Sequence, residues 1–559
     1  MIIGIDMGGT NIDGVLIHDG KLQKSFKHPV DRNDYFQSIW HCLQELLRDT
    51  DKDAIERIHL STTISTNAIV EDQISQVGVV LQTGPGLKWD FERLGHHLAF
   101  VSGSVDHRGF VVKSEDPQEL NGLRKTFLTS PIEAIAVISK FSTRNPEFEQ
   151  KVRDLFLHDY EEITMGHTLS GKLNFPRRVQ TAYLNAAVSS TFRTFADNMQ
   201  KALKEENIEA PVFILKADGG TIDLSGATVK PVETILSGPA ASFMGMSALL
   251  PEIQEDRCLL DIGGTTTDLF FLVDGVPVFE PLGIEIDGRK TLVRAIYSTS
   301  VGLGGDSHVR FEEGKLKIGP RRMGSAIGFG GEDLTPTDAL VYLGAMQAKY
   351  PEKSREALEK LATKQGLDPA ELAEGIVKEF CYRIKEVMEN TLEMLNASPV
   401  YTIKELLSDR AIKPSSVGII GGPAQALAPH LEETLGMSVE YPDTYEVANA
   451  IGAALARPTI EINLLADTDR KILSIPELQI YEEIDRSYDL ERAKREALQE
   501  VSRAAEAMGL VDASKTEIVE ASSYNMVRSF YGADKNIRVK AQIKPGLLTK
   551  LTDVKTSEV

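Results

Sequence analysis

The sequence predicts an α/β protein built from two duplicated halves that face each other, followed by a separate C-terminal α+β region. The main observation is a motif that occurs twice, as IDMGGTNID at residues 5–13 and as LDIGGTTTD at residues 260–268, with its aspartates, glycines and first threonine in register. Between residues 132 and 165 strands alternate with a helix, which is typical of parallel pairing. From residue 457 the chain turns into a charged helix and polar strands, which marks the appended region.

Each copy of the motif is a predicted hairpin whose turn suits an anion. An apolar strand leads to the Gly-Gly-Thr turn, and apolar residues after it indicate a returning strand, which excludes a strand-to-helix dinucleotide loop. Glycines let backbone N–H groups approach an anion without a Cβ in the way, and threonine adds a hydroxyl donor. The predicted phosphate contacts form two loops, loop 1 with Gly8, Gly9, Thr10 and Asn11, and loop 2 with Gly263, Gly264, Thr265 and Thr266.

The aspartates of the motif suit metal-assisted phosphoryl transfer. Asp6 and Asp261 stand just before the glycines, where a carboxylate can hold a hydrated Mg²⁺ or steer a nucleophile, so both are predicted catalytic and metal-binding residues. Asp13 and Asp268 lie on the returning strands, and two roles stay open for them: contact with the ligand, or satisfying the loop itself. One copy alone would fit an ordinary glycine hairpin equally well, whereas two copies in register favour a shared site.

Two later glycine clusters extend the predicted nucleotide site. The first lies in VGLGGD at residues 301–306, and the second follows a predicted strand at residues 417–420 and opens a helix. The start of a helix presents N–H groups and bare backbone to a ligand, here the adenosine end of a nucleotide. The nucleotide contacts predicted from these clusters are Gly304, Gly305, Gly421, Gly422 and Pro423.

Candidate substrate contacts follow the short strand at residues 58–61. Clustered hydroxyls and an amide side chain there resemble a substrate rim, although a helix N-cap is an open alternative and a lone histidine is more often structural than catalytic. Another candidate lies at the strand-to-glycine junction of residues 217–221. The predicted substrate contacts are His59, Thr62, Thr63, Asn67 and Asp218.

Small-residue helices and changes of character divide the chain. Helices at residues 178–206 and 446–456 are rich in alanine, and we expect them to pack against each other as a hinge because small side chains allow a close, sliding contact. The predicted divisions are a first half at 1–250 with an insertion near 84–130, a second half at 251–456, and the appended region at 457–559.

Length and composition predict a multidomain globular protein of the cytoplasm. The 559 residues are 42% hydrophobic and 26% charged, and no stretch approaches the length of a membrane span. The net charge of −21 argues against a nucleic-acid partner or an anionic membrane surface. The three cysteines lie far apart, so we expect core packing rather than a disulfide framework, and a reducing compartment fits. The N-terminus is a predicted strand without the basic flank of a signal peptide.

Eight segments occur along the chain in this order: IDMGGTNID, HLSTTISTNAIVE, TAYLNAAV, ADGGTIDLSGA, ILSGPAA, LDIGGTTTDL, VGLGGDS and PTDALVYLG. Together they resemble the hydantoinase A/5-oxoprolinase family, which includes acetone carboxylase subunits and shares the actin-like ATPase architecture of sugar kinases and heat-shock ATPases. The resemblance covers residues 2 to about 456. It implies ATP-dependent opening of a small cyclic amide such as a hydantoin or 5-oxoproline, with ATP and Mg²⁺, a hydantoinase B-like partner subunit and a homo-oligomer.

Three segments depart from the family pattern. Asp306 and His308 follow the third glycine cluster where the family usually has glycine and a small or apolar residue, and whether they bind a metal is open. Residues 321–333 lack the family's Pro-Gly-Pro and Cys-Tyr-Gly run, and residues 86–90 read GLKWD where the family tends to have Gly-Phe-Arg-Asp. These departures leave the identity of the acceptor substrate open.

The chemistry that the resemblance implies is phosphoryl activation of an amide. Transfer of the γ-phosphoryl group to the amide oxygen removes amide resonance and makes that oxygen a leaving group, so the protein mainly positions reactants and neutralises charge. Two other functions stay open: an actin-like ATPase that acts as a reactivase or chaperone-like partner of another protein, and a small-molecule kinase. ADP release that depends on a lactam would indicate the amide-opening enzyme. ATPase activity stimulated by another protein would indicate the reactivase, and a stable phosphoester would indicate the kinase.

Overall fold

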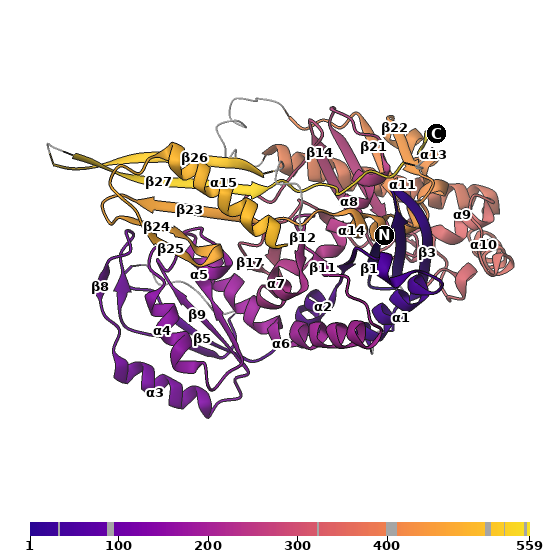
Figure 1. Ribbon diagram of the computed structural model, residues 1–559. Coiled ribbons are helices and arrows are strands. Elements are labelled where there is room, and N and C mark those ends of the chain that lie inside the picture. Colours follow the sequence, from indigo (N-terminus) through magenta and orange to yellow (C-terminus); the bar gives the residue numbers. More distant parts are fainter. Residues whose placement is uncertain are drawn as a thin grey trace.

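The structure is a computed structural model that describes residues 1–31, 34–86, 94–320, 324–397, 411–508, 516–529, 532–552 and 556–558 (Figure 1). Residues 87–90 and 321–323, which belong to the segments that depart from the family pattern, lie outside this part of the chain. The described chain has the predicted duplicated α/β fold, with mixed sheets covered by helices.

The first sheet has six strands in the order β12-β11-β4-β1-β2-β3. Strands β1, β2 and β3 form an antiparallel meander that contains the first predicted hairpin. Strand β4 pairs with β1 in parallel, and β11 pairs with β4 in parallel. The bounds are β1 Ile2–Met7, β2 Asn11–His18, β3 Lys21–Pro29, β4 Arg57–Ser61, β11 Val212–Leu215 and β12 Thr221–Asp223.

The second sheet repeats this arrangement. Strand β13 is antiparallel to β14 and parallel to β21, as β1 is to β2 and β4, and Asp261 lies opposite Asp268 as Asp6 lies opposite Asp13. The two sheets therefore have equivalent strand pairings, which confirms the internal duplication that the repeated motif predicted. The strands are β13 Arg257–Ile262, β14 Thr267–Val273, β15 Val276–Pro277, β18 Thr299–Val301, β21 Ser416–Ile420, β22 Ser438–Pro442 and β28 Thr556–Glu558.

Two helices, α8 (Ser237–Leu249) and α14 (Ala448–Leu455), lie between the two sheets and share one core with both (Figure 1). They cross with their backbones almost in contact. A Cβ on Gly245 would lie 2.2 Å from the carbonyl oxygen of Ala448, and one on Gly452 would lie 2.2 Å from that of Ala241.

The expectation that the helix near residue 186 is the partner of α14 is therefore wrong. That helix, α6 (Phe175–Glu205), packs against two sheets instead. Its N-terminal part packs in the core of a separate four-stranded sheet, and its C-terminal part, from Phe192 to Leu203, packs under the first sheet. Small residues allow a close contact between helices but do not determine which helix is the partner. Helix α8 can approach α14 closely because it has a glycine, Gly245, at the crossing.

The separate sheet has the parallel order β10-β9-β5-β6. Helices α3 and α4 cover one face and α6 the other. The sheet begins before residue 84 and ends after residue 130, so it extends beyond both predicted ends of the insertion. The elements are β5 Val77–Gln82, β6 His97–Phe100, β9 Ala134–Ser139, β10 Glu162–Met165, α3 Pro117–Leu128 and α4 Glu147–Phe156.

The C-terminal region forms a five-stranded antiparallel sheet, β25-β24-β23-β27-β26, covered by α15. Strands β26 and β27 are longer than predicted and project from the body as a ribbon (Figure 1). The end of the chain was expected to be a polar tail, but β28 pairs with β22 of the second sheet. The elements are β23 Glu461–Asp467, β24 Ile472–Ile475, β25 Ile480–Glu483, α15 Leu490–Ala507, β26 Thr516–Ser529 and β27 Gly532–Ile543.

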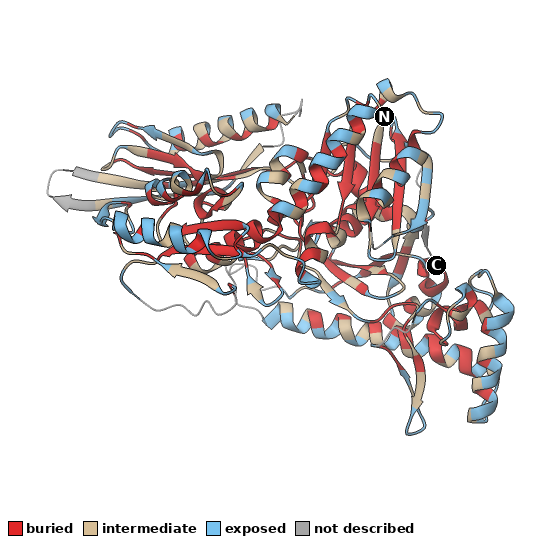
Figure 2. Cartoon of the chain, turned by 90° about the horizontal axis from the view of Figure 1, so that it is seen from below, coloured by how far each residue is buried: buried red, intermediate tan, exposed pale blue. Residues whose placement is uncertain are grey.

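The remaining helices pack around the sheets: α1 and α7 on the first sheet, α13 on the second, α2 and α5 against α6, and α9 and α10 with α11. Figure 2 shows buried residues along the strands and exposed residues on the outward faces of the helices. All three cysteines are buried with free thiols, as core packing predicts. No helix of the described chain is long and apolar enough to cross a membrane. These helices are α1 Tyr35–Leu47, α2 Ile64–Val70, α5 Gly166–Leu169, α7 Leu224–Val229, α9 Pro336–Tyr342, α10 Pro351–Gln365, α11 Pro369–Ala397 and α13 Ala424–Leu435.

Candidate functional site

Loops 1 and 2 have the same turn geometry at the ends of their hairpins. The N–H of Gly8 donates to the carbonyl oxygen of Asn11 at 3.0 Å, and that of Gly263 donates to Thr266 at 2.9 Å. The tip of each loop is exposed. A Cβ added to Gly9 would have no protein atom within 4 Å, so this side of loop 1 is open space that a ligand could enter.

The third glycine cluster packs directly against loop 2. The N–H groups of Gly305 and Asp306 donate to the carbonyl oxygens of Gly263 and Gly264 at 2.9 and 2.8 Å. A Cβ on Gly304 would lie 2.6 Å from the carbonyl carbon of Gly264. Two predicted clusters that are about forty residues apart in sequence thus form one surface.

The fourth cluster reaches the same place from β21. Gly421 has a φ of +99°, and a Cβ there would lie 2.3 Å from the carbonyl oxygen of Ile262, so this position requires glycine. A Cβ on the next residue, Gly422, would meet no atom within 4 Å. Pro423 lies 3.5 Å from where a Cβ of Gly305 would stand. Every glycine cluster predicted from the second half therefore adjoins loop 2.

The carboxylates of the two halves meet at α14. The Asn449 amide donates to Asp261 Oδ2 at 3.3 Å and also forms a hydrogen bond with Asp6. Ser242 of α8 donates to Asp261 Oδ2 at 2.6 Å, and Ser61 forms a hydrogen bond with Asp6. The two interdomain helices thus connect the aspartates of the duplicated hairpins.

Desolvation and mutual repulsion make these carboxylates reluctant to ionise. Burial, with repulsion from Asp13 and Asp261, raises the pKa of Asp6 to about 7. Burial and the charge of Asp261 raise the pKa of Asp268 to about 6. Burial also raises the pKa values of Asp13 and Asp261 above their ordinary range. A cation placed among these groups would relieve both costs.

The donor set fits Mg²⁺ held through its water shell. The buried Oδ1 atoms of Asp6 and Asp268 have no hydrogen-bond partner, and both hydrogen bonds to the Asp261 carboxylate use Oδ2, so Asp6 and Asp261 each keep an acceptor for a ligand. Within the described residues no three or more His, Cys, Asp or Glu side chains are arranged to enclose a metal. Mg²⁺ usually keeps several waters and takes only one or two protein carboxylates, which is what Asp6 and Asp261 offer.

The raised pKa of Asp6 gives a prediction with a defined sign. From pH 4 to 7 the folded state holds a proton on Asp6 that the unfolded state has lost, so the free energy of unfolding falls as pH rises through this window. The neutral Asp6→Asn variant lacks this loss. In metal-free urea unfolding, its stability advantage over the wild type is expected to grow by about 3 kcal/mol between pH 5 and 8. An advantage that is the same at both pH values would contradict this assignment.

His59 has a structural position, which the alternative reading of a lone histidine anticipated. Its ring is completely buried, Nδ1 lies 2.9 Å from the carbonyl oxygen of Ala453 in α14, and its edge packs on Phe213. Burial lowers its pKa to about 3, so it stays neutral. The structure therefore gives no support for His59 as a substrate contact.

The other residues after β4 lie at the start of α2. Thr62 is buried and its hydroxyl accepts from the N–H of Ile64 at 3.3 Å. Thr63 is the N-cap of α2 without a side-chain cap, and its hydroxyl accepts instead from the amide of Asn67 at 3.2 Å. Thr63 and Asn67 are partly exposed and are available to a ligand, whereas Thr62 is not.

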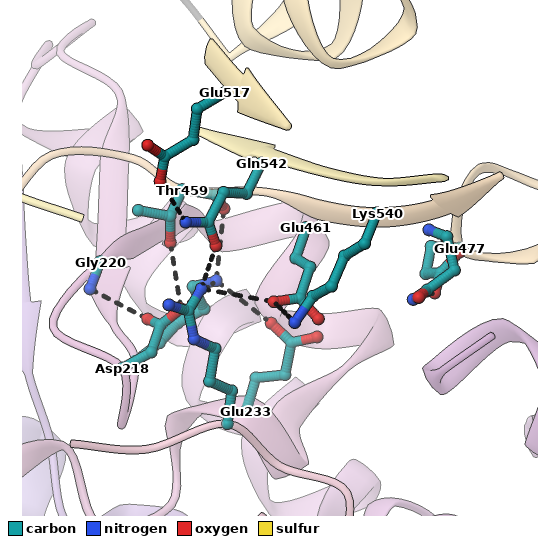
Figure 3. A network of polar contacts seen from close by, with 12 residues as sticks. Asp218, Gly220, Glu233, Thr459, Glu461, Glu477, Glu517, Lys540 and Gln542 are labelled. Atoms are coloured by element: carbon teal, nitrogen blue, oxygen red, sulfur yellow. Dashed lines mark hydrogen bonds and ion pairs between the residues drawn. The ribbon is translucent and has the colours of Figure 1, made fainter. Parts of the chain in front are cut away.

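Asp218 belongs to a buried ionic network rather than to an open rim (Figure 3). Its carboxylate lies 3.6 Å from Lys216 Nζ and accepts from the N–H of Gly220 at 3.0 Å. Although burial opposes ionisation, Lys216 holds the pKa of Asp218 below its ordinary value. Neighbouring pairs join Glu461 of β23 with Arg294 and with Lys540 of β27. Lys216 of the first half also donates to the carbonyl oxygen of Thr459, so the network fastens the C-terminal region to both predicted halves, which is a structural role.

Asp306 and His308 do not come together with further metal ligands. His308 Nδ1 lies 3.4 Å from Asp333 Oδ1, and no metal-binding group of three such residues occurs in the described chain. The position of Asp306 is defined by its N–H bond to loop 2. The hypothesis that Asp306 and His308 bind a metal therefore gains no support from the described residues.

Two family models match most of the chain. A model of the hydantoinase/oxoprolinase N-terminal region matches residues 2–158, and the hydantoinase/oxoprolinase model matches residues 178–462. The chain belongs to the hydantoinase/oxoprolinase family. Both loops, α8 and α14 lie within the matched residues.

Named relatives within the family act on different substrates. The chain is 25% identical to the acetophenone carboxylase gamma subunit of Aromatoleum aromaticum over 66% of this chain and 58% of that one. It is 25% identical to the caprolactamase subunit alpha of Pseudomonas jessenii (78% and 67% covered) and 26% identical to 5-oxoprolinase 1 of Arabidopsis thaliana (81% and 41%). Against the first and third of these, the chain spans less than two thirds of the relative's length.

Two solved structures share the fold over nearly the whole chain. A nucleotide-free acetone carboxylase chain superposes with a TM-score of 0.69 at 16% identity, covering 99% of this chain and 88% of that one. The ATP-dependent caprolactamase from Pseudomonas jessenii gives 0.67 at 18% identity, covering 97% and 87%. The family fold therefore includes the C-terminal sheet as well as the duplicated halves.

Sequence reasoning missed the polar residues that connect the aspartates. Asn449 stands in a helix that was interpreted only as a packing surface, and Ser242 stands in α8, which was not predicted as a helix. An isolated polar residue in such a helix is a signal that could have found them, because a buried polar group needs a partner. Lys27 was also missed, since it stands on an otherwise ordinary edge of the meander.

Proposed function

We propose that the chain binds Mg²⁺ and ATP between loops 1 and 2 and uses ATP to open a small cyclic amide. The observation that supports this most strongly is the meeting of Asp6 and Asp261 from the duplicated hairpins at Asn449, beside two loops with exposed tips and open space at Gly9. The related caprolactamase of Pseudomonas jessenii is ATP-dependent. The names caprolactamase and 5-oxoprolinase each refer to a cyclic amide substrate.

The residues divide the work by chemistry. Backbone N–H groups of both loops bind the phosphates, and the two later clusters hold the adenosine side. Asp6 and Asp261 hold the hydrated Mg²⁺, whose chemistry when bound is to neutralise phosphate charge. Thr63 and Asn67 remain the candidate acceptor contacts. The proposed nucleotide residues are Gly8, Gly9, Thr10, Asn11, Gly263, Gly264, Thr265, Thr266, Gly304, Gly305, Gly421, Gly422 and Pro423.

The proposed reaction couples two bond exchanges. The amide oxygen forms a bond to the γ-phosphorus while the bond from that phosphorus to the bridging oxygen breaks, and ADP leaves. Water then adds to the carbon, and the ring C–N bond breaks as the nitrogen leaves with a proton, which gives an open-chain acyl phosphate. A second water hydrolyses the acyl phosphate, so that phosphate departs and the amino acid remains. Amide resonance is lost in the first exchange, so the protein's contribution is alignment and charge stabilisation.

The assembly we propose is a complex with a hydantoinase B-like subunit, within a homo-oligomer. The names of the acetophenone carboxylase and caprolactamase relatives identify them as subunits, which supports the first part. We retain the divisions at residues 1–250, 251–456 and 457–559 as proposed domains, with α8 and α14 as the contact between the first two.

ATP turnover with a panel of lactams tests the function. We expect ADP, phosphate and ring-opened amino acid in equal amounts with hydantoin, 5-oxoproline or caprolactam, measured with and without a co-expressed hydantoinase B-like subunit. A stable phosphoester without free phosphate would instead identify a kinase. ATPase activity that responds only to another protein would identify a reactivase.

A further inference from the structure

Lys27 is the cation that reaches the carboxylate cluster. It stands on β3 directly opposite Asp13 of β2, and its Nζ lies 2.9 Å from Asp13 Oδ1 and 3.1 Å from Oδ2. The same ammonium donates to the carbonyl oxygen of Glu446, at the entrance to α14, at 3.1 Å. One lysine thus contacts the end of loop 1 and the chain that leads into the interdomain helix.

The electrostatics of the cluster give this lysine a role beyond one ion pair. Against the effect of burial, its charge lowers the pKa values of both Asp13 and Asp261, which belong to different halves. A nucleoside triphosphate would add several negative charges to a site that already holds four aspartates, in a protein of net charge −21. Positive charge from the protein is needed there in addition to Mg²⁺.

The geometry leaves the ammonium able to take a ligand. Its side chain is 46% exposed although Asp13 is only 13% exposed, so the lysine faces solvent over a largely buried carboxylate. An ammonium has three N–H donors, and two acceptor groups account for two of them. The flexible stem of lysine allows the third to meet a phosphate oxygen without displacing Asp13.

We propose that Lys27 binds the polyphosphate of the nucleotide between loops 1 and 2, with Asp13 as the residue that positions its ammonium. This inference rests on the proposed nucleotide site. It also explains how Asp13 differs from its counterpart: Asp13 forms an ion pair with Lys27, whereas Asp268 forms none among the described residues. The open question of Asp13 is thereby answered by a role in positioning.

Calorimetric binding of Mg²⁺ with a non-hydrolysable ATP analogue, with ADP and with adenosine tests the inference in the full chain. Lys27→Met is expected to lower the affinity for the ATP analogue at least tenfold and the affinity for ADP by less. The affinity for adenosine should not change, because the lost contact is to phosphate. Lys27→Arg is expected to restore most of the affinity for the analogue, because it restores the charge.

A double variant separates phosphate binding from mere neutralisation of Asp13. Asp13→Asn combined with Lys27→Met leaves no uncompensated charge, so continued weak binding of the analogue supports the inference, and wild-type binding overturns it. An equal loss for adenosine, which lacks phosphate, would also overturn it. If the wild type binds no ATP analogue, the proposed function itself fails.

Discussion

Gly9→Val is expected to reduce the affinity for Mg·ATP by at least about a hundredfold while leaving the fold intact. A Cβ at residue 9 would have no protein atom within 4 Å beyond its chain neighbours, and the backbone there is outside the left-handed region, so we expect the valine to project into the space left for a ligand. Charged hydrogen bonds contribute about 1.5–3 kcal/mol each, so losing two reaches this magnitude. Calorimetry of binding and the melting temperature measure the two effects separately.

Two further glycines sharpen the test. Gly264→Val in loop 2 is expected to give a similar loss, since both halves contribute to one site. Gly421→Ala is the matched control, because its φ of +99° and the carbonyl of Ile262 at 2.3 Å oblige the backbone to move. That variant should lower the melting temperature, whereas Gly9→Val should not. A folded Gly9→Val protein that binds Mg·ATP normally would remove loop 1 from the site.

Asp261→Asn is expected to lower turnover by on the order of a thousandfold with no loss of stability. The asparagine oxygen can still accept from Ser242 and Asn449, so the fold keeps these contacts, whereas the charge that orients Mg²⁺ is gone. Burial raises the pKa of Asp261, so a neutral side chain also removes a desolvation cost. Steady-state ATPase rates and thermal melting are the two measurements.

A surface aspartate provides the matched control for this variant. Asp333 lies 3.4 Å from His308 and outside the carboxylate cluster, so Asp333→Asn should leave turnover unchanged. A sharp fall in melting temperature with intact ATPase activity in Asp261→Asn would instead show that Asp261 only supports its loop.

The sequence predicted the features that local chemistry determines. Gly-Gly-Thr between two apolar runs specifies a hairpin over a few residues, so the two loops and the opposition of Asp6 to Asp13 and of Asp261 to Asp268 follow from the motif alone. The later glycine clusters were predicted for the same reason, because each combines a strand end with bare backbone.

Contacts between distant segments could not be predicted in this way. Asp218 stands at a strand-to-glycine junction like those of the loops, but its surroundings include Thr459, more than two hundred residues away, and no local pattern indicates that partner. Likewise, alanines in α6 and α14 permit close packing without specifying it, so α8 was missed as the partner of α14. The proposed role of Lys27 depends on its position opposite Asp13 in the neighbouring strand, which the residues around Lys27 do not indicate.

Hydrogen exchange at the two loops tests the central claim most directly. On addition of Mg²⁺ and a non-hydrolysable ATP analogue, amides of residues 8–11 and of residues 263–266 should become protected together, at the same ligand concentration, because one set of phosphates binds both. Protection of only one loop, or of neither at saturating nucleotide, would contradict a shared site between the duplicated halves.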